Sequence, residues 1–183
     1  MLLHNPAACG SGEREDPVKL AILTTGGTIE KTYDERDGSL RNFHSILPKM
    51  LSTLRLPDLD IAYEQVVFKD SLEMTPADRR RILEATERAL RTTDAVVILH
   101  GTDTLSETGE LLEESLGALS APVILTGAMR PYEFRDTDAL QNLTEALLAA
   151  RLVLPGIYVA MHNRVLRFPG VIKDRDRLTF NKR

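Results

Sequence analysis

The chain has 183 residues, of which 43% are hydrophobic and 27% are charged, a composition typical of a single soluble domain. Its formal net charge of −4 disfavours nucleic acid or an acidic membrane surface as the main partner. The longest apolar runs are only about as long as one strand, so no membrane-spanning segment is expected.

The first residues differ in character from the rest. We expect residues 1–16 to be a flexible polar lead-in and residues 17–183 to form the domain. Cys9 is the only cysteine, so no disulfide forms within the chain and a cytoplasmic location is expected. Ala7–Gly10 is similar to a bacterial lipid-attachment site, but the preceding residues lack the basic and apolar regions of a signal peptide.

Five short apolar runs, rich in β-branched residues and leucine, predict buried strands. They are Lys19–Thr24, Ile61–Phe68, Ala95–His100, Pro122–Thr126 and Ile157–Met161. Because most of them do not alternate strictly with polar residues, they suit strands that are covered on both faces, as in a parallel sheet.

An amphipathic helix is predicted after the second of these strands. Thr75 is a good N-cap, Pro76 suits the first helical position, and Asp78 is an acid at the third. The arginine run 79–81 lies within this helix, where acidic and basic residues recur at i,i+4 and favour a solvated, ion-paired face over a nucleic-acid patch. The expected pairs are Arg80/Glu84, Glu84/Arg88 and Glu87/Arg91.

Three further helices are expected. Thr104 and Glu107 have the spacing of a capping box, so we interpret Thr104 as a helix cap. Asp138 opens another helix, which runs to about residue 151. A helix over 43–54 is disturbed by Pro48.

Strands that alternate with helices predict a doubly wound, mostly parallel α/β sheet with right-handed crossovers. After Met161 the pattern changes to a polar, basic tail in which Phe168–Gly170 predicts a turn. Ligands of such sheets bind beyond the carboxyl ends of the strands.

Four segments rich in hydroxyl groups and glycine follow the predicted strands. They are Thr24–Thr28, Asp70–Glu73, His100–Thr104 and Thr126–Pro131. A shared pocket at this edge of the sheet accounts for all four, and their glycines allow the backbone to approach a ligand closely.

Other kinds of site have weaker support. His100 and Asp103 form a possible metal pair, but no second histidine or cysteine lies at a ligand spacing, which favours a structural histidine. Gly26–Thr28 lacks the lysine of a P-loop and the third glycine of a dinucleotide loop. The chain has no Gly-x-Ser-x-Gly elbow.

What remains is a hydroxyl nucleophile that needs a nearby base. A threonine is a poor nucleophile until a neighbouring group takes its proton, and Tyr33 and Lys173 are the candidates for that group. The residues therefore indicate acyl transfer or hydrolysis.

Three motifs in one order resemble the bacterial-type L-asparaginase and glutaminase-asparaginase family. They are Thr25–Ile29, His100–Thr104 and Gly127–Pro131. The resemblance covers about residues 18–181, which correspond to the N-terminal domain of that family. It implies hydrolysis of the side-chain amide of L-asparagine to aspartate and ammonia through a threonine acyl-enzyme, with no cofactor and no metal.

The resemblance also implies roles for individual residues. By this resemblance, Thr28 corresponds to the primary nucleophile of the family, with Tyr33 as its activating partner. Thr102, Asp103 and Lys173 correspond to the family's second catalytic group.

The substrate contacts follow from the same resemblance. Ser71 and Asp103 correspond to residues that hold the substrate's α-carboxylate and α-ammonium, and Ala128 belongs to the substrate pocket. Backbone N–H groups of Gly27 and Thr28 are expected to help hold the oxyanion.

Two departures from the family pattern affect these expectations. Leu72 stands where one branch has a glutamine that contacts substrate. The smaller C-terminal domain, which helps form the dimer and lends an acidic residue to the neighbouring active site, is expected to be absent. We expect a homo-oligomer, a dimer by analogy; the alternative to an enzyme is a non-catalytic amino-acid-binding protein or assembly subunit.

Overall fold

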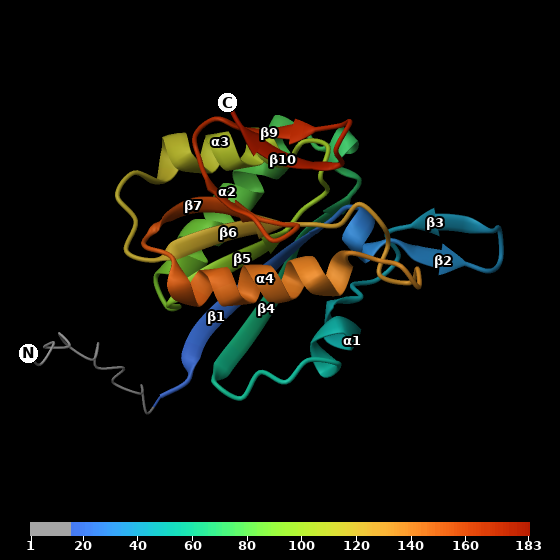
Figure 1. The fold of residues 1–183 in the computed structure, drawn as a ribbon, viewed down its shortest axis with the longest axis horizontal. Coiled ribbons are helices and arrows are strands. Elements are labelled where there is room, and N and C mark those ends of the chain that lie inside the picture. The colour runs from blue at the N-terminus through green and yellow to red at the C-terminus, as the bar shows by residue number, and fades with distance from the viewer. Residues whose placement is uncertain (1–15) are drawn as a thin grey trace, which may run out of the picture.

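A six-stranded sheet runs through the centre of the domain (Figure 1). The computed structural model describes residues 16–183. In spatial order the strands are β4 (Leu59–Lys69), β1 (Val18–Gly26), β5 (Ala95–Leu99), β6 (Pro122–Thr126), β7 (Gly156–Ala160) and β8 (Val165–Arg167). The first five are parallel and β8 is antiparallel to β7, which confirms the predicted doubly wound, mostly parallel sheet.

All five predicted strands are present, with ends that differ by at most two residues from the expected ones. Strands β5, β6 and β7 are buried along their whole length, which explains their continuous apolar sequences. The predicted lead-in, residues 1–16, lies outside the described residues except for Asp16.

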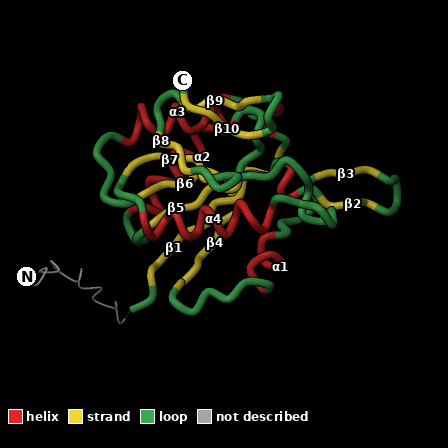
Figure 2. The backbone as a smooth tube through the Cα atoms, in the orientation of Figure 1, coloured by secondary structure: helices red, strands yellow, loops and turns green. Residues whose placement is uncertain are grey.

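Helices cover both faces of the sheet (Figure 2). On one face lie α2 (Pro76–Leu90) and α3 (Leu105–Leu116), and on the other lie α1 (Leu47–Ser52) and α4 (Ala139–Leu152). Alternate residues of β5 serve the two cores: Val96 and Ile98 pack with α2 and α3, whereas Val97 and Leu99 pack with α4. Over residues 16–183, no helix is both long and apolar enough to cross a membrane.

The predicted helix caps are only partly confirmed. Thr75 is the predicted N-cap of α2, and with the predicted acid Asp78 it forms a capping box. Thr104 is the N-cap residue of α3 as predicted, but the expected capping box does not form, because its hydroxyl donates to the carbonyl of Ser71 at 2.8 Å. Asp138 precedes α4 as expected but forms no side-chain cap, since its carboxylate accepts from N–H groups of Met129 and Arg130 at the start of the same loop.

The other helical expectations need smaller corrections. Helix α1 is only six residues long, and Pro48 lies at its start, where a missing N–H costs nothing. The exposed face of α2 is ion-paired, but none of the three predicted i,i+4 pairs forms in the described chain. The pairs that form are Arg79 with Glu107, Arg81 with Asp78 and Arg88 with Glu64.

Two small hairpins escaped the sequence prediction. One joins β2 (Thr32–Asp34) to β3 (Ser39–Arg41) and projects from the body of the domain (Figure 1). The other joins β9 (Val171–Asp174) to β10 (Thr179–Lys182), in the region expected to be a polar tail. The chain does bend at Phe168–Gly170, as predicted, and Phe168 and Phe180 are buried beside α3.

Helix α3 passes very close to this C-terminal region. An ideal Cβ on Gly109 would lie 2.1 Å from Cζ of Phe168, whose side chain is 1% exposed. The glycine therefore permits a contact between helix and ring that no side chain allows.

Gly109→Ala tests this contact. Alanine in a helix interior normally stabilises by about 1 kcal/mol relative to glycine, but here the added methyl group overpacks the core and should destabilise by about 1–3 kcal/mol. Denaturant unfolding measures the change. Thr144→Ala, at an exposed position of α4, is the control and should shift stability by less than about 0.5 kcal/mol. A G109A variant at least as stable as the parent would contradict the account.

Candidate active site

Loops that follow three parallel strands meet at the carboxyl edge of the sheet. An ideal Cβ on Gly27 would lie 2.3 Å from Cα of Gly101, and one on Gly101 would lie 2.7 Å from Cβ of Ser71. Three residues predicted to share a site, from the ends of β1, β4 and β5, are therefore in direct contact.

The loop after β6 joins the same cluster. An ideal Cβ on Gly127 would lie 2.3 Å from the carbonyl oxygen of His100 and 3.2 Å from Cγ2 of Thr102. Ala128 follows and is 1% exposed. All four segments that the sequence singled out thus lie at one edge of the sheet.

Lys173 reaches this edge from β9, about seventy residues further along the chain. Its Nζ donates to Thr102 Oγ1 at 2.8 Å and to Asp103 Oδ1 at 3.0 Å. The Lys173 and Asp103 side chains are 13% and 28% exposed, and Thr102 is 4% exposed. The three residues predicted to form the second catalytic group are therefore joined through the Lys173 ammonium.

Three other threonine hydroxyls at this edge donate hydrogen bonds to backbone carbonyl groups. Thr25 donates to the carbonyl of Leu99, Thr104 to that of Ser71, and Thr126 to that of Ala160. These contacts explain why so many threonines follow the strands.

Ser71 is different. Its residue is 1% exposed, and within the described chain its Oγ has no hydrogen-bond partner. A buried hydroxyl without a partner costs about 1–3 kcal/mol, which a bound polar ligand would recover.

The Thr28 loop is held firmly. The N–H of Gly27 donates to the carbonyl of Lys69 at 2.9 Å, and the carbonyl of Gly27 accepts from Asn42 Nδ2 at 3.0 Å. The Gly27 N–H is therefore occupied and does not offer the oxyanion contact expected of it. Thr28 begins a short 3-10 turn, where the first N–H has no partner within the turn.

Tyr33 does not lie with the other predicted residues. It belongs to the projecting β2–β3 hairpin, is 59% exposed, and its hydroxyl lies beside Gly38 at the hairpin turn. Its backbone N–H donates to Glu133 Oε2 at 2.6 Å, which anchors the base of the hairpin. Leu72, which stands where one branch of the resembled family has a glutamine, is 68% exposed.

His100 has a structural role. It is fully buried, and its two ring nitrogens lie 2.8 Å from the carbonyl of Gly101 and 2.8 Å from Thr108 Oγ1. Because the carbonyl only accepts, Nδ1 donates to it and Nε2 accepts from the threonine. Burial lowers the pKa of His100 to about 4, so the ring is neutral near pH 7 and both nitrogens are engaged.

Glu30 is a buried acid that the sequence analysis missed. It is 0% exposed, and its carboxylate accepts from the N–H of Gly26 at 3.1 Å and from Ser45 Oγ at 2.5 Å. Burial raises its pKa to about 7, although both hydrogen bonds act in the opposite direction. No local pattern distinguishes a buried glutamate that follows an apolar residue from an exposed one.

Arg175 was also missed. Its Nη1 donates to Asp103 Oδ1 at 3.1 Å, the oxygen that also accepts from Lys173. Arg175 lies in the turn that follows β9, so strand alternation with Lys173 gave no signal for it. The guanidinium is 69% exposed, so this pair contributes little to stability.

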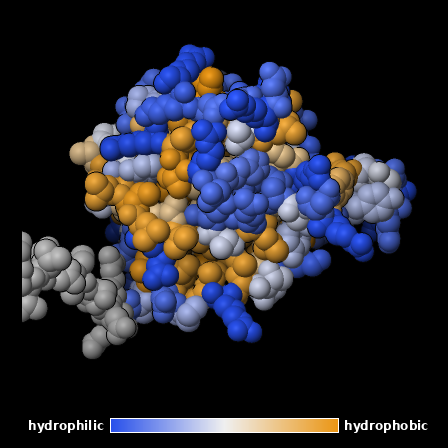
Figure 3. Space-filling model, viewed as in Figure 1, coloured by the Kyte–Doolittle hydropathy of each residue, from blue (hydrophilic) through white to orange (hydrophobic). Residues whose placement is uncertain are grey.

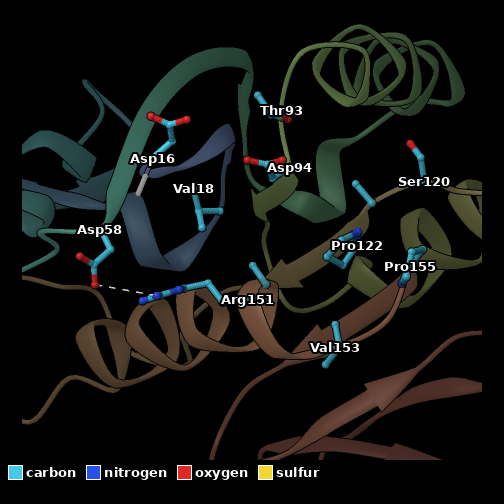
Figure 4. Close-up of a pocket in the computed structure, with 12 residues that line it drawn as sticks. Asp16, Val18, Asp58, Thr93, Asp94, Ser120, Pro122, Arg151, Val153 and Pro155 are labelled. Carbon is cyan, nitrogen blue, oxygen red and sulfur yellow. Dashed lines mark ion pairs between the residues drawn. The ribbon is translucent and has the colours of Figure 1, made fainter. Parts of the chain in front are cut away.

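A cavity of about 910 Å³ lies at the opposite, amino-terminal edge of the sheet (Figure 4). Asp16, Asp58, Asp94 and Arg151 line it, and it contains none of the predicted site residues. Ligands of parallel sheets bind at the carboxyl edge, so we assign the site to the four loops around Lys173 and not to this cavity.

Comparison with known proteins identifies the family. The family model described as "Asparaginase, N-terminal" matches residues 19–176. The chain belongs to the asparaginase family. It is 34% identical to the L-asparaginase of Thermococcus kodakarensis over 149 residues, covering 81% of this chain and 45% of the relative. The solved structure of the thermostable L-asparaginase from that organism superposes with a TM-score of 0.81 and 32% identity, covering 90% of this chain and 51% of the other.

Two further relatives widen the comparison. A structure of a probable cytoplasmic L-asparaginase from Campylobacter jejuni has a TM-score of 0.75 and 28% identity, covering 90% of this chain and 51% of that one. A glutamyl-tRNA(Gln) amidotransferase subunit of Pyrobaculum aerophilum is 35% identical over 151 residues, covering 79% of this chain and 35% of the relative. This asparaginase-family chain spans less than half the length of the curated relatives that it matches.

Glu30→Gln tests the buried acid. In the native state its pKa is about 7, compared with an ordinary value of 4.5, so the unfolded chain loses this proton first as pH rises. The contribution of Glu30 to stability is therefore complete below pH 4.5 and is lost as pH rises towards 7, a loss of about 3 kcal/mol. Urea unfolding between pH 4.5 and 7.5 should show this decline in the parent and not in E30Q. Parallel pH profiles would contradict it.

Proposed function

We propose that residues 17–183 form a catalytic domain that hydrolyses the side-chain amide of L-asparagine to aspartate and ammonia. One observation carries the proposal: Lys173 Nζ lies 2.8 Å from Thr102 Oγ1 and 3.0 Å from Asp103 Oδ1, in a cluster that also includes the Thr28 loop. A lysine bonded to a threonine hydroxyl is an arrangement that moves protons to and from a nearby reacting group.

The substrate occupies the space between these loops. Ser71 binds the α-carboxylate, which supplies the partner that its buried hydroxyl lacks. Asp103 receives the α-ammonium, and Ala128 closes the pocket from the β6 side.

Thr28 is the primary nucleophile. Its Oγ forms a bond to the amide carbon, the C–N bond breaks, and the hydroxyl proton leaves with the departing ammonia. Water then attacks the acyl-enzyme and returns a proton to Thr28, with Thr102 and Lys173 as the proton-transferring pair. The N–H of Thr28 contributes to oxyanion stabilisation. These steps require neither a cofactor nor a metal.

Tyr33 remains the proposed activating partner of Thr28. Because its hydroxyl lies beside Gly38, this role requires the β2–β3 hairpin to turn its tyrosine towards the substrate when the site is occupied. Hairpins attached at one end are the kind of element that closes over active sites.

The second candidate function is a non-catalytic amino-acid-binding protein or assembly subunit. The name of the Pyrobaculum aerophilum relative, which is a component of an amidotransferase, favours this alternative because that name implies work with a partner protein. A folded chain that binds L-aspartate but releases no ammonia from any ω-amide would support it.

We also propose that the chain forms a homodimer and acts in the cytoplasm. Leu148, Leu152 and Leu154 are 54%, 73% and 77% exposed in the C-terminal half of α4 and just beyond it, and hydrophobic surface lies on that side of the domain (Figure 3). Such patches mark association surfaces. Light scattering that finds only monomer at working concentrations would contradict the dimer.

The single cysteine and the Campylobacter relative support the proposed cytoplasmic location, and cell fractionation tests it.

Thr28→Ala tests the mechanism. The parent should release ammonia from L-asparagine, and T28A should lower kcat by at least about a thousandfold because the nucleophile is lost. Thr102→Val and Lys173→Met should each lower it by a hundredfold or more. Coupled assay of ammonia measures the rates, with Thr144→Ala as the matched control of unchanged activity. Full activity in T28A would exclude the mechanism, and a folded but inactive parent would exclude the proposed reaction.

A further inference from the structure

Three polar side chains outside the catalytic cluster connect separate parts of the domain. His162 Nε2 lies 2.8 Å from Asp138 Oδ2, and His162 Nδ1 lies 3.1 Å from Thr179 Oγ1. Asp138 precedes α4, His162 follows β7, and Thr179 begins β10. The His162 and Asp138 side chains are 26% and 16% exposed, so the network is largely shielded from water.

The partners of His162 determine its neutral tautomer. An ionised carboxylate only accepts hydrogen bonds, so Nε2 carries the proton that is donated to Asp138. Nδ1 then accepts from the hydroxyl of Thr179. Burial raises the pKa of Asp138, but hydrogen bonds from the Met129 N–H and from His162 together lower it below its usual value, which keeps the carboxylate in its accepting form.

One end of this network holds the loop after β6. Asp138 accepts from the N–H of Met129 at 2.9 Å and from the N–H of Arg130 at 3.0 Å. Met129 Sδ in turn lies 3.7 Å from Thr102 Oγ1. The carboxylate that His162 contacts therefore orders the loop that packs against a proposed catalytic threonine.

The other end holds the hairpin that carries Lys173. In the β9–β10 ladder, Thr179 is paired with Asp174 and Phe180 with Lys173. A hydrogen bond from Thr179 to His162 thus fixes β10 one ladder position from the lysine. The hairpin is joined to the main sheet at a second point, where Arg164 Nη1 donates to the carbonyl of Phe180.

The same residues lie in two hairpin turns that fix their backbone conformation. In the described chain, the non-glycine residues with positive φ are His162 at 55°, Asn163 at 59° and Leu178 at 51°. All three lie within one residue of His162 or Thr179. His162 and Asn163 are the two central residues of the tight turn between β7 and β8, in which Met161 and Arg164 exchange backbone hydrogen bonds, and such a turn requires positive φ at both positions. The N–H of His162 also donates to Asn142 Oδ1 at 3.1 Å.

We infer that His162 is a positioning residue. It joins the loop after β6 to the β9–β10 hairpin that carries Lys173, so that Thr102 and Lys173 keep their contact. The inference rests on the proposed function for its catalytic consequence. The link itself rests only on the hydrogen bonds described above.

Two conservative variants separate the two ends of the link. A glutamine amide occupies the place of histidine Nε2 and an asparagine amide the place of Nδ1. His162→Gln should therefore keep the bond to Asp138 and lose Thr179, whereas His162→Asn should do the reverse. Hydrogen exchange should rise about tenfold over residues 171–182 in H162Q and over residues 127–131 in H162N, with β5 unchanged in both. Thr144→Ala is the control, with no change in either segment.

Two further measurements address the tautomer and catalysis. Nitrogen NMR of the histidines should find His162 in its Nε2–H form in the parent, and Thr179→Val should change that signal. In both His162 variants kcat should fall about tenfold with KM within twofold, because Ser71 and Asp103 are untouched. A structural role alone would lower the melting temperature and leave kcat per folded molecule unchanged.

The outcomes separate this inference from the proposed function. Unchanged hydrogen exchange over residues 171–182 in H162Q would overturn it. If the parent is active, a kcat in both His162 variants equal to that of the parent would also overturn it. If the parent is inactive but the two variants loosen the two segments separately, the link stands and the proposed reaction fails.

Discussion

The close approach of glycine backbones at the carboxyl edge of the sheet is the constraint on which the site depends. Gly27 contacts Gly101, Gly101 contacts Ser71, and Gly127 contacts the carbonyl of His100, each at a separation that no Cβ permits. These contacts bring the loops after β1, β4, β5 and β6 into one cluster. Since the loops leave parallel strands of one buried sheet, the rigidity of the core extends directly to the residues that we assign to the chemistry.

Lys173 completes this cluster from a distant part of the chain. The β9–β10 hairpin is short, but Phe168, Val171 and Phe180 bury it against α3, and Gly109 admits the Phe168 ring. Packing on one face of the domain therefore places an ammonium group beside Thr102 at the sheet edge. The core contact at Gly109 and the polar link at His162 hold the same hairpin from different sides.

Sequence periodicity predicted the parts of the fold that depend on long, regular segments. The five apolar strands and the N-cap of α2 were correct because burial on both faces and a local cap leave a clear pattern. The hairpins were missed because strands of three or four residues are too short to establish a period. Thr104 is at the predicted N-cap of α3 but forms no capping box, because a tertiary partner, the carbonyl of Ser71, takes its hydroxyl.

The candidate site was predictable to a similar degree and for similar reasons. Strand ends located Ser71, Thr102 and Asp103. The need for a base beside a threonine nucleophile pointed to Lys173, whose bonds to Thr102 and Asp103 the structure contains. Glu30 and His162 were missed because their importance comes from burial and from partners distant in sequence. The position of Tyr33 in an exposed hairpin depends on tertiary structure that no local pattern encodes.

The identity of the nucleophile is the central claim, and trapping the acyl-enzyme tests it most directly. The parent protein would be mixed with L-asparagine, quenched in acid within milliseconds and digested, and the modified residue located by mass spectrometry. The account predicts a β-aspartyl ester on Thr28, absent from Thr28→Ala. An ester on Thr102 or another hydroxyl, or rapid ammonia release with no ester on any residue, would contradict it.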